Sequence, residues 1–568
     1  MAGEYRVEGT NAAAPFTLTA HRSEGMALLA MNWRTGRPPD DFVGFGIRYY
    51  PPNSTRYFHV TNRLSFQGVP DFGKRQPSTK APIQKFRWVH FPSNADTPGA
   101  FRYIVTPMFM DADDKLHAGE AQEVAIALAR ETYPGMLDVT FTRGFVSSQA
   151  FVDKFEKDGP INTLLPATAD EGLTFIPTHP KTAAALKWMG FEARRAVLEV
   201  LDEAIADPTA TVRAVAYDLS EPGALSRMEQ LGSRLRVIVD DSDAHGETTS
   251  GESQSAARLI ASAGAANVKR QHMGNLQHNK TIVVSGPNLQ RVVCGSTNFS
   301  WRGFFVQNNN AIVLTGASAV APFAAAFEQY WVAGPTAFGK SASATWSDLG
   351  LAGVDAKVTF SPHSAGTAML TSIADDIRTG TTSSLLYSLA FLYQTAGPVR
   401  EAIALVTADP TIFVSGISDR AVGGIAVQTP NGNVAPVYPA SLSNNVPAPF
   451  SKEPVGGGGI RMHHKFVVID FDKPTARLYL GSYNFSGPAD KENGENLLLI
   501  TDRRIATSYA VEAVRLFDHY QFRLRQQSAG TATATLALRK PPRLPGEFPW
   551  FNGDYTNAHR IRDRELFA

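Results

Sequence analysis

The chain has 568 residues, too many for one hydrophobic core, so we expect about two to four domains. Its composition, 43% hydrophobic and 19% charged, is that of an ordinary globular protein. With 54 Lys and Arg against 53 Asp and Glu, the net charge is +1. This balance excludes a strong overall field toward nucleic acid or an anionic membrane, and leaves a local basic patch open.

Cysteine content and hydropathy indicate in which cell compartment the protein is expected. The single cysteine, Cys294, excludes an intramolecular disulfide and suits a reducing cytoplasm. Residues 1–16 lack the basic and apolar regions of a signal peptide, so we expect a cytoplasmic protein and leave open secretion after removal of a signal. The alanine-rich run 317–331 contains Pro322 and Glu328 and predicts a packed amphipathic helix, so we expect no transmembrane segment.

Residues 1–132 predict an accessory β-sandwich domain. Apolar runs bounded by turn residues replace any long helical pattern, at 16–20, 26–33, 42–50, 56–61, 85–91, 101–110 and 123–129. Phe86, Trp88 and His90 alternate with Arg87 and Val89, as on a strand. Short strands at this spacing favour a sandwich, and runs 45–50 and 101–107 resemble strands of immunoglobulin-like or fibronectin type III domains.

After residue 133, helical stripes and apolar strands alternate. An apolar stripe at 193–205 predicts a helix, followed by a strand at 212–218, a helix at 223–231, a strand at 235–240 and a helix at 254–263. The order recurs after Trp346, with elements at 358–360, 369–377, 384–389, 399–406 and 411–415. This α/β texture predicts largely parallel sheets covered by helices, in two lobes at 133–340 and 341–568.

An internal repeat carries the strongest signal. The first copy reads Gln-His-Asn-Lys-Thr-Ile-Val-Val-Ser at 277–285 and Cys-Gly-Ser-Thr-Asn-Phe-Ser at 294–300. The second copy reads Met-His-His-Lys-Phe-Val-Val-Ile-Asp at 462–470 and Leu-Gly-Ser-Tyr-Asn-Phe-Ser at 480–486. His278 precedes Asn298 by 20 residues and His463 precedes Asn484 by 21, so the two copies match in spacing as well as in residue type.

The spacing predicts one composite site. Residues two apart on a strand share a face, so His278 can project with Lys280, and His463 with Lys465. Each strand should turn and return, which brings Gly-Ser-x-Asn beside its own His-x-Lys. Two such lobes related by a pseudo-twofold axis would surround one phosphate. By the same alternation, His464 should point to the opposite face and take no part in catalysis.

These residue types suit cleavage of a phosphodiester. Lysine ammonium groups and the amides of Asn298 and Asn484 can hold the anionic oxygens. One histidine can attack phosphorus to give a phosphohistidine, while the other protonates the leaving alkoxide and then activates water or an alcohol. No metal or other cofactor is needed, because lysines and amides already neutralise the charge.

The repeat resembles the signature of the phospholipase D superfamily, His-x-Lys-x4-Asp followed by Gly-[Ser/Thr]-x-Asn. The second copy matches fully, with Asp470 and Ser482 completing it, while the first has Ser285 in place of the Asp and Ser296 in the second motif. The resemblance covers roughly residue 138 to the C-terminus. It implies two pseudo-twofold-related lobes, each a mixed sheet flanked by helices, and, since both motifs lie in one chain, a monomer.

The copies differ in a position that bears on catalysis. Glu495 follows Gly481 by 14 residues, where the family often places a carboxylate that orients the histidine; Asn309 stands at the same distance from Gly295. We therefore expect Glu495 to support His463 and an amide to face His278. The resemblance implies that the first-motif histidine attacks, so His278 is the predicted nucleophile and His463 the predicted acid and base.

Two polar segments near these motifs have other interpretations. Asp241, Asp243, His245, Gly246 and Glu252 have nearly the spacing of a calcium loop, but a strand precedes them and histidine is a poor calcium ligand, so a polar loop at the site mouth is preferred. The glycine run 456–459 lacks the Gly-Lys-[Ser/Thr] of a phosphate-binding loop and predicts a flexible segment leading to His463. His272 and His363 are candidates to line the cleft.

The sequence leaves the substrate open. A lipid enzyme needs an apolar rim, for which Phe304-Phe305 after Trp301 and the run 391–393 are candidates. A nuclease needs massed basic residues, whereas Arg194-Arg195, Lys269-Arg270 and Arg523…Arg525 are scattered. We expect hydrolysis or transphosphatidylation of a phospholipid, with a metal-independent nuclease as the alternative and a degenerate phosphate-binding protein as a third possibility.

Overall fold

The structure is a computed structural model. It describes residues 4–69, 72, 74–92, 94–130, 132–144, 151, 154–168, 170–392, 396–419, 425–430, 434–437, 462–530 and 537–568, and for 425, 434–437 and 521–530 only the backbone. The predicted flexible glycine run 456–459 and the rim candidate Tyr393 lie outside these ranges.

The first lobe is built on a mixed sheet with the strand order β12-β18-β17-β16-β13-β14-β15. Its strands are β12 (Leu137–Phe141), β13 (Thr211–Ala216), β14 (Leu235–Val239), β15 (Val268–Arg270), β16 (Lys280–Ser285), β17 (Gln290–Gly295) and β18 (Asn310–Thr315). β13, β14 and β15 run parallel, and the other neighbours are antiparallel. We call this part lobe 1.

Lobe 2 repeats the arrangement in the strand order β19-β20-β27-β26-β25-β21-β22-β23-β24. Its strands are β19 (Ser347–Asp348), β20 (Asp355–Ser361), β21 (Ser384–Leu389), β22 (Phe413–Asp419), β23 (Ile425–Gln428), β24 (Val434–Val437), β25 (Lys465–Ile469), β26 (Arg477–Gly481) and β27 (Glu495–Thr501). The implied mixed sheets flanked by helices are confirmed. The largely parallel arrangement predicted from the alternating helices and strands is wrong, because each motif strand returns in antiparallel hairpins, as β16-β17-β18 and β25-β26-β27.

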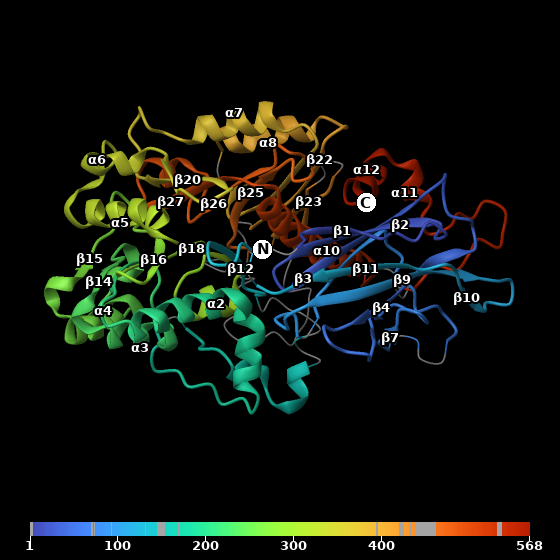
Figure 1. Ribbon diagram of the computed structural model, residues 1–568, viewed down its shortest axis with the longest axis horizontal. Helices are drawn as coiled ribbons and strands as arrows, with labels where there is room; N and C mark the ends of the chain where they lie inside the picture. Colours follow the sequence, from blue (N-terminus) through green and yellow to red (C-terminus); the bar gives the residue numbers. More distant parts are fainter. Residues whose placement is uncertain are drawn as a thin grey trace.

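Helices cover the outer faces of both sheets and fill the space between them (Figure 1). They are α2 (Thr182–Ala206), α3 (Pro222–Gln230), α4 (Gly251–Ala263), α5 (Ala317–Val332), α6 (Pro335–Phe338), α7 (Leu370–Gly380), α8 (Pro398–Thr407), α9 (Gly487–Lys491), α10 (Arg503–Gly530), α11 (Asn552–Thr556) and α12 (Ala558–Leu566). α2, α3 and α4 pack on lobe 1, and α7 and α8 pack on lobe 2. α5 and α10 contribute to one core shared by the two sheets, which ties the lobes together.

The N-terminal region is all β, as predicted, and its described strand pairings are antiparallel. One sheet holds β1 (Arg6–Glu8), β2 (Phe16–Ser23), β3 (Met26–Trp33) and β8 (Arg87–His90). The other holds β4 (Phe42–Tyr50), β5 (Phe58–His59), β9 (Ala100–Met110), β10 (Leu116–Ala118) and β11 (Gln122–Ala127), and β6 (Thr61–Asn62) pairs with β7 (Gln76–Pro77). Side chains from both sheets form one apolar core.

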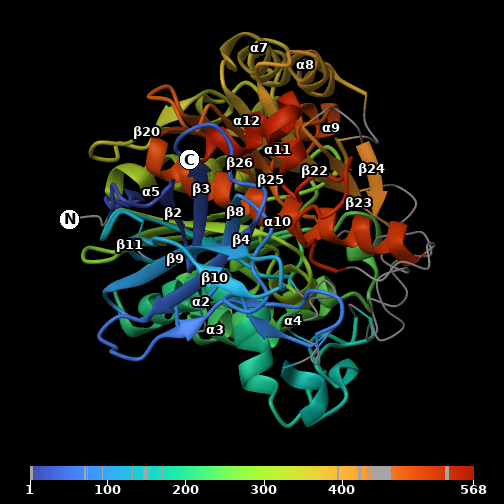
Figure 2. The ribbon, with the colours of Figure 1, turned by 90° about the vertical axis from the view of Figure 1, so that its right-hand side faces the viewer.

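The end of the chain returns to this N-terminal region, where α11 and α12 lie against the strands (Figure 2). Phe551 is fully buried in the core of the β region, and the Trp550 indole donates to the Phe42 carbonyl at 3.1 Å. The Arg87 guanidinium donates to Asp518 of α10 at 2.6 Å and to Asp563 of α12 at 2.7 Å. The β region is therefore bound to the lobes by both apolar and ionic contacts.

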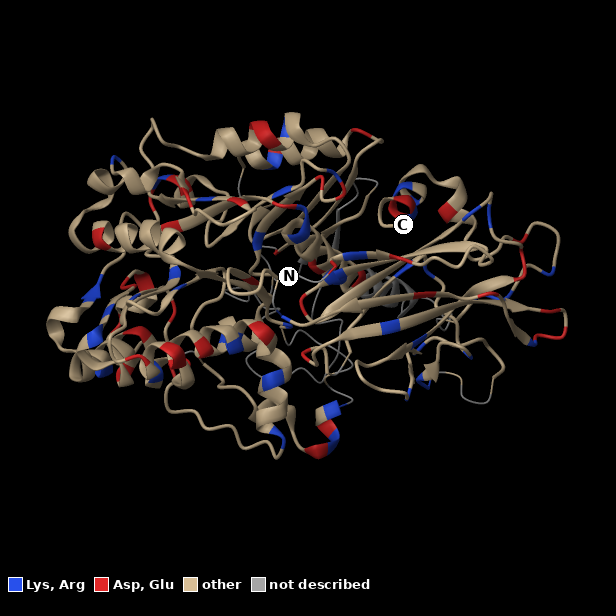
Figure 3. Ribbon diagram, in the orientation of Figure 1, with Lys and Arg blue, Asp and Glu red and all other residues tan. Residues whose placement is uncertain are grey.

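Three further features agree with the sequence. Cys294 is buried in β17, as expected for a small core residue. Basic and acidic residues are interspersed over the ribbon (Figure 3). Within the described part of the chain, no helix has the length and apolar character needed to cross a membrane.

Candidate active site

The two motif histidines meet at the interface between the lobes. His278 stands just before β16 and His463 just before β25, and both are buried. Their ring centroids are 6.2 Å apart with an interplanar angle of 73°. Residues 185 positions apart in the sequence are therefore brought face to face at the lobe interface.

Each histidine is supported by the opposite lobe, which corrects the pairing expected from the sequence. The Nδ1 of His278 lies 2.8 Å from a carboxylate oxygen of Glu495 in lobe 2. The Nδ1 of His463 lies 2.8 Å from Oδ1 of Asn309 and 3.1 Å from the Ser296 carbonyl in lobe 1. The carboxylate thus serves the predicted nucleophile, and the amide serves the predicted acid and base.

The exchange follows from how the sheets abut. Glu495 opens β27 and Asn309 precedes β18, so both point out of their own sheet toward the other lobe. Backbone bonds lock the two edges: the His463 amide donates to the Asn308 carbonyl at 3.2 Å, and the Gly494 amide donates to the Leu276 carbonyl at 2.8 Å. Separation along the chain therefore misled the prediction, since the nearest carboxylate in space comes from the other repeat.

Both histidines are held with Nδ1 as the donor, because their Nδ1 partners are acceptors. The orientation of Asn309 is fixed, since its Nδ2 donates to the Gly303 carbonyl at 2.9 Å and its Oδ1 also accepts from Ser296 Oγ at 2.9 Å. Nε2 of each imidazole is left for chemistry.

Burial lowers the pKa of His278, and the Glu495 carboxylate offsets this only in part. Burial opposes ionisation of Glu495, yet the charge and hydrogen bond of His278 bring the pKa of that carboxyl below its usual value. Burial, Lys465 and Lys280 hold the pKa of His463 well below the usual value. Burial thus favours the neutral form of both imidazoles, while the interaction with His278 favours the ionised form of Glu495.

The two lysines lie beside their own histidines. Lys465 Nζ donates to the His463 carbonyl at 2.8 Å, and Lys280 Nζ donates to the His278 carbonyl and lies 4.6 Å from the centre of the Tyr217 ring. Burial lowers the pKa of Lys280 to about 8, and burial together with Lys280 lowers that of Lys465 well below its usual value. An anionic ligand would relieve this cost, which is what a phosphate-binding pair requires.

The motif amides differ in their surroundings. Asn298 Nδ2 donates to Asp218 at 2.7 Å, whereas Asn484 lines a cavity in lobe 2. The Oδ1 atoms of both are buried and make no hydrogen bond within the described residues. Each amide thus keeps an unpaired acceptor oxygen, and the two stand in unlike environments.

The motif serines act on the supporting residues rather than on the space between the histidines. Ser296 accepts from the Asn310 amide at 3.0 Å while donating to Asn309. Ser482 accepts from the Asn496 amide at 3.0 Å and donates to the Glu495 carboxylate. Each serine therefore orients the residue that holds the histidine of the opposite lobe.

Asp470 and Ser285 lie at the far ends of the motif strands. The buried Asp470 carboxylate accepts from the backbone amides of residues 382, 383 and 384 at 2.8 to 3.0 Å, and from the Thr382 hydroxyl at 2.6 Å. It fixes the start of β21 and is far along β25 from His463. Ser285 pairs with Thr211 across β16 and β13 and has no such role. The absence of an aspartate at position 285 therefore does not change the contacts of the histidines.

Two aspartates that sequence reasoning did not assign to the site position the motif backbone. Asp240, after β14, accepts from the amide of Gln277 at 2.6 Å, and Asp419, at the end of β22, accepts from the amide of Met462 at 3.3 Å. Gln277 and Met462 each precede a motif histidine. The signal was present in the repeat, because an aspartate ends the equivalent strand in both copies.

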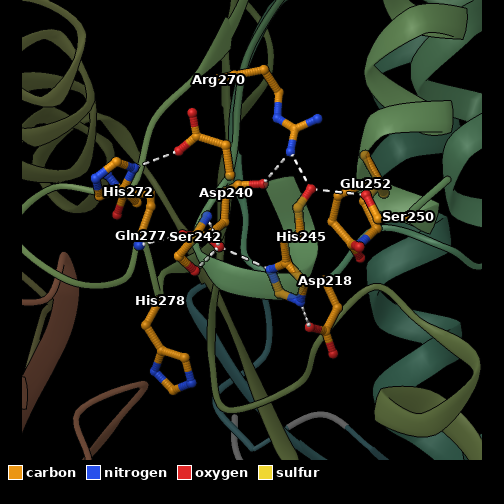
Figure 4. Close-up of polar contacts among 12 residues, drawn as sticks. Asp218, Asp240, Ser242, His245, Ser250, Glu252, Arg270, His272, Gln277 and His278 are labelled. Carbon is orange, nitrogen blue, oxygen red and sulfur yellow. Dashed lines mark hydrogen bonds and ion pairs between the residues drawn. The ribbon is translucent and has the colours of Figure 1, made fainter. Parts of the chain in front are cut away.

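The predicted polar loop forms an ion network at the edge of the site (Figure 4). His245 Nδ1 lies 2.8 Å from Asp240 and Nε2 lies 3.4 Å from Asp218, while Glu252 accepts from the Leu219 amide at 3.0 Å. Burial opposes protonation of His245, but these two carboxylates raise its pKa to about 10.

Asp218, His245 and Glu252 offer ligand atoms within 4.8 Å of one another, so they could hold a metal ion. A metal would have to displace the His245 proton, which the raised pKa opposes. The calcium-loop spacing is not realised, since Asp241 pairs with His272 at 2.8 Å instead. The expectation of a metal-free site stays a prediction.

The remaining candidates fall in three places. Phe304 and Phe305 are fully buried and Trp301 nearly so, which makes the prediction of an exposed rim there wrong: a π-helical turn at Arg302–Val306 folds them into lobe 1. His363 is buried against Asp490 at 2.8 Å, and His272 is exposed. His464 bonds Glu512 at 3.0 Å on the opposite face from His463, as predicted.

Comparison with known families agrees with this geometry. A family model described as "Cardiolipin synthase, PLD-like domain" matches residues 204–331 and 430–517, which contain both motifs. The chain therefore carries a PLD-like domain in two copies, as the resemblance of the motifs implied. A phospholipase D of Rickettsia prowazekii (strain Madrid E) is 47% identical over 47 residues, or 8% of this chain and 21% of the relative, and one of Rickettsia felis is 45% identical over the same length. The match thus spans about a fifth of these relatives.

Solved structures show only distant likeness. The phosphatidylserine synthase of Haemophilus influenzae Rd KW20 is 12% identical, with 73% of this chain and 99% of that chain covered and a TM-score of 0.38. Nuc of Salmonella typhimurium, a phospholipase D family member, is 22% identical, with 24% and 86% covered and a TM-score of 0.20. These likenesses are too distant to bear on the substrate.

Proposed function

We propose that the chain cleaves a phosphodiester through a phosphohistidine at His278. The observation that carries this is the pair of facing imidazoles, each held through Nδ1 by the opposite lobe, at a ring separation of 6.2 Å. Two imidazoles at this separation, each with its Nε2 left free by the Nδ1 hydrogen bond, could act on opposite faces of one phosphorus atom. Lys280, Lys465, Asn298 and Asn484 supply donors for its charged oxygens.

The first half of the reaction transfers the phosphoryl group to the protein. Nε2 of neutral His278 attacks phosphorus, the new P–N bond forms, and the P–O bond to the leaving alcohol breaks. The alkoxide takes the Nε2 proton of protonated His463. The negative substrate favours that protonated form, and Glu495 stabilises the positive charge that develops on His278.

The second half of the reaction releases the phosphoryl group from His278. His463, now neutral, takes a proton from water, the water oxygen attacks phosphorus, and the P–N electron pair returns to His278. The products are an alcohol and a phosphate monoester, and both histidines regain their starting states. If an alcohol replaces water, the same steps give transphosphatidylation.

We propose a phospholipid as the substrate. Three basic candidates for a nucleic-acid groove whose side chains the structure describes are already engaged: Arg194 pairs with Glu221 at 2.7 Å, Arg195 with Glu192 at 2.8 Å, and Arg270 with backbone carbonyls of the polar loop. The side chains of Arg523 and Arg525 lie outside the described part of the chain. A cavity with apolar walls adjoins Asn484. A metal-independent nuclease is the alternative, and a phosphate-binding protein without turnover is the third.

The finer organisation is also a proposal. We take residues 1–132 as an immunoglobulin-like accessory domain, 133–340 and 341–568 as the two catalytic lobes, and the protein as a cytoplasmic monomer. Size-exclusion chromatography with light scattering would test the oligomeric state.

The decisive assay uses purified protein in the presence of a chelator, with phosphatidylcholine and with single- and double-stranded DNA. Release of choline and phosphatidate with intact DNA is expected. Shortened DNA would overturn the lipid proposal in favour of the nuclease. Binding of phosphate without turnover of either substrate would leave the phosphate-binding protein.

A further inference from the structure

One position of the repeat differs in chemistry between the lobes. In lobe 1, Ala216 of β13 pairs with Lys280, and in lobe 2, Leu389 of β21 pairs with Lys465. Two residues further on, the equivalent places are held by Asp218 and Phe391. Because these places adjoin the two catalytic lysines, the difference lies next to the phosphate site on both sides.

In lobe 1 this place is taken by an ion network. The Asp218 carboxylate accepts from Asn298 Nδ2 at 2.7 Å and from the Ser300 hydroxyl at 3.3 Å, and it faces His245 at 3.4 Å. Figure 4 shows Asp218 and His245 turned toward each other beside His278. An apolar group placed here would separate charges from their partners, at a substantial cost in free energy.

In lobe 2 the same place opens into a cavity of about 300 Å³. Its apolar lining includes Leu370, Leu389, Phe391, Leu392 and Phe485. Asn484 also lines it, and the Oδ1 of that amide is buried without a hydrogen-bond partner among the described residues. The cavity is therefore continuous with the motif that is proposed to hold the phosphate.

We propose that this cavity binds a hydrocarbon substituent of the substrate, so that the phosphodiester enters the site in one direction, with its apolar arm in lobe 2. The inference rests on the proposed function, because it uses the phosphate site as its anchor. The volume of the cavity is at the lower end of the range for small-molecule sites. It would hold the first several carbons of an acyl or alkyl chain.

Arg400 and Lys491 also line the cavity, while other polar groups of the lining are engaged within the protein. Asp490 is already engaged by His363 at 2.8 Å and by the Met369 amide at 3.1 Å. The Ser486 hydroxyl caps α9 by accepting from the Ala489 amide. A hydrocarbon would pack against the apolar part of this lining and needs no hydrogen-bond partner from it.

The test measures binding of monoalkyl phosphates, methyl through hexyl, by isothermal titration calorimetry. A monoalkyl phosphate has one arm, so its affinity reports the cavity whichever substituent leaves during turnover. The wild-type affinity should rise with chain length, by up to about fourfold per methylene. In Ala368→Trp, which fills the cavity from its wall, the affinity should stay near that of methyl phosphate at every length.

Ala365→Trp is the matched control, since Ala365 is exposed, three residues earlier, and not part of the lining. It should keep the wild-type dependence on chain length. Thr371→Trp, at an exposed position of the lining, should repeat the effect of Ala368→Trp and guards against a folding defect in the first variant. Unchanged methyl phosphate affinity shows that the phosphate site is intact.

Two results would overturn the inference: a chain-length dependence that survives both cavity variants, or thymidine monophosphate binding more tightly than hexyl phosphate and losing affinity in those variants. Failure of the proposed function looks different. Alkyl phosphates would then bind with the expected dependence while the wild type turns over neither lipid nor DNA.

Discussion

Lobe 1 and lobe 2 carry the same histidine, lysine, serine and asparagine, yet they supply unlike partners across the interface. Lobe 2 gives His278 a carboxylate, Glu495, and lobe 1 gives His463 an amide, Asn309. A carboxylate stabilises a cationic imidazole far more than an amide does. We therefore expect the two histidines to have different roles, and each role to depend on a residue in the other repeat.

The strongest test of this division removes each histidine. His278→Ala and His463→Ala should each lower multiple turnover by about 10⁴-fold or more, because neither half of the reaction can be completed. With a p-nitrophenyl phosphodiester, whose leaving group needs no proton, His463→Ala should accumulate a phosphohistidine that mass spectrometry places on His278. His272→Ala, at an exposed histidine six residues before His278, should retain activity. A phosphoryl group found on His463 in His278→Ala would reverse the roles.

The next test removes the charge that supports the nucleophile. Glu495→Gln keeps the shape but cannot stabilise the positive charge on His278, so kcat should fall by about 100-fold or more. Glu512→Gln makes the same change at the buried pair with His464, away from the site. Its folded fraction should keep the wild-type kcat. Equal losses in both variants would mean that Glu495 acts only through stability.

A third test gives lobe 1 the carboxylate that lobe 2 has. In Asn309→Asp, a negative group would face His463 and raise its pKa by about 1 unit or more. Because His463 must be protonated to act as the acid, the fall of kcat/KM at high pH should move to higher pH. Ser285→Asp also restores an acidic residue to the first copy, but at the far end of β16, and should leave the profile unchanged. A profile that does not move in Asn309→Asp would contradict the assignment of His463 as the acid.

The smallest effect on catalysis is expected at Asp470. Asp470→Asn loses the charge that receives hydrogen bonds from residues 382–384, which should lower the free energy of unfolding by about 2 kcal/mol with kcat unchanged. Urea denaturation followed by tryptophan fluorescence measures this. Ser285→Ala, at the equivalent place in lobe 1, should change stability little. A large loss of kcat in Asp470→Asn would place this aspartate in the catalytic machinery after all.

Local patterns in the sequence were enough to predict the bounds of several strands and to find the motif residues. β3 and β4 begin and end where the apolar runs 26–33 and 42–50 do, and β21 coincides with the run 384–389. Alternation along β25 also placed His464 on the face away from His463. These features depend on neighbours along the chain, which the sequence displays directly.

Features that depend on contacts between distant segments could not be predicted from the sequence. The partner of His278 lies 217 residues away, and no local pattern distinguishes it from Asn309, which is only 31 residues away. The Trp301-Phe305 segment has the composition of an exposed apolar rim, but a π-helical turn buries it. In both cases the packing of distant segments, rather than local preference, decides the outcome.

The ion pairs of Arg87 and the packing of Phe551 constrain the order in which parts of the chain can fold during synthesis. Phe551 completes the core of the first-made β region, and Asp518 and Asp563 complete the ion pairs of Arg87. Asp518 and Asp563 follow Arg87 by 431 and 476 residues, so the β region cannot complete these contacts until both lobes have been synthesised. Until then, part of the apolar interior of its strands stays open to water.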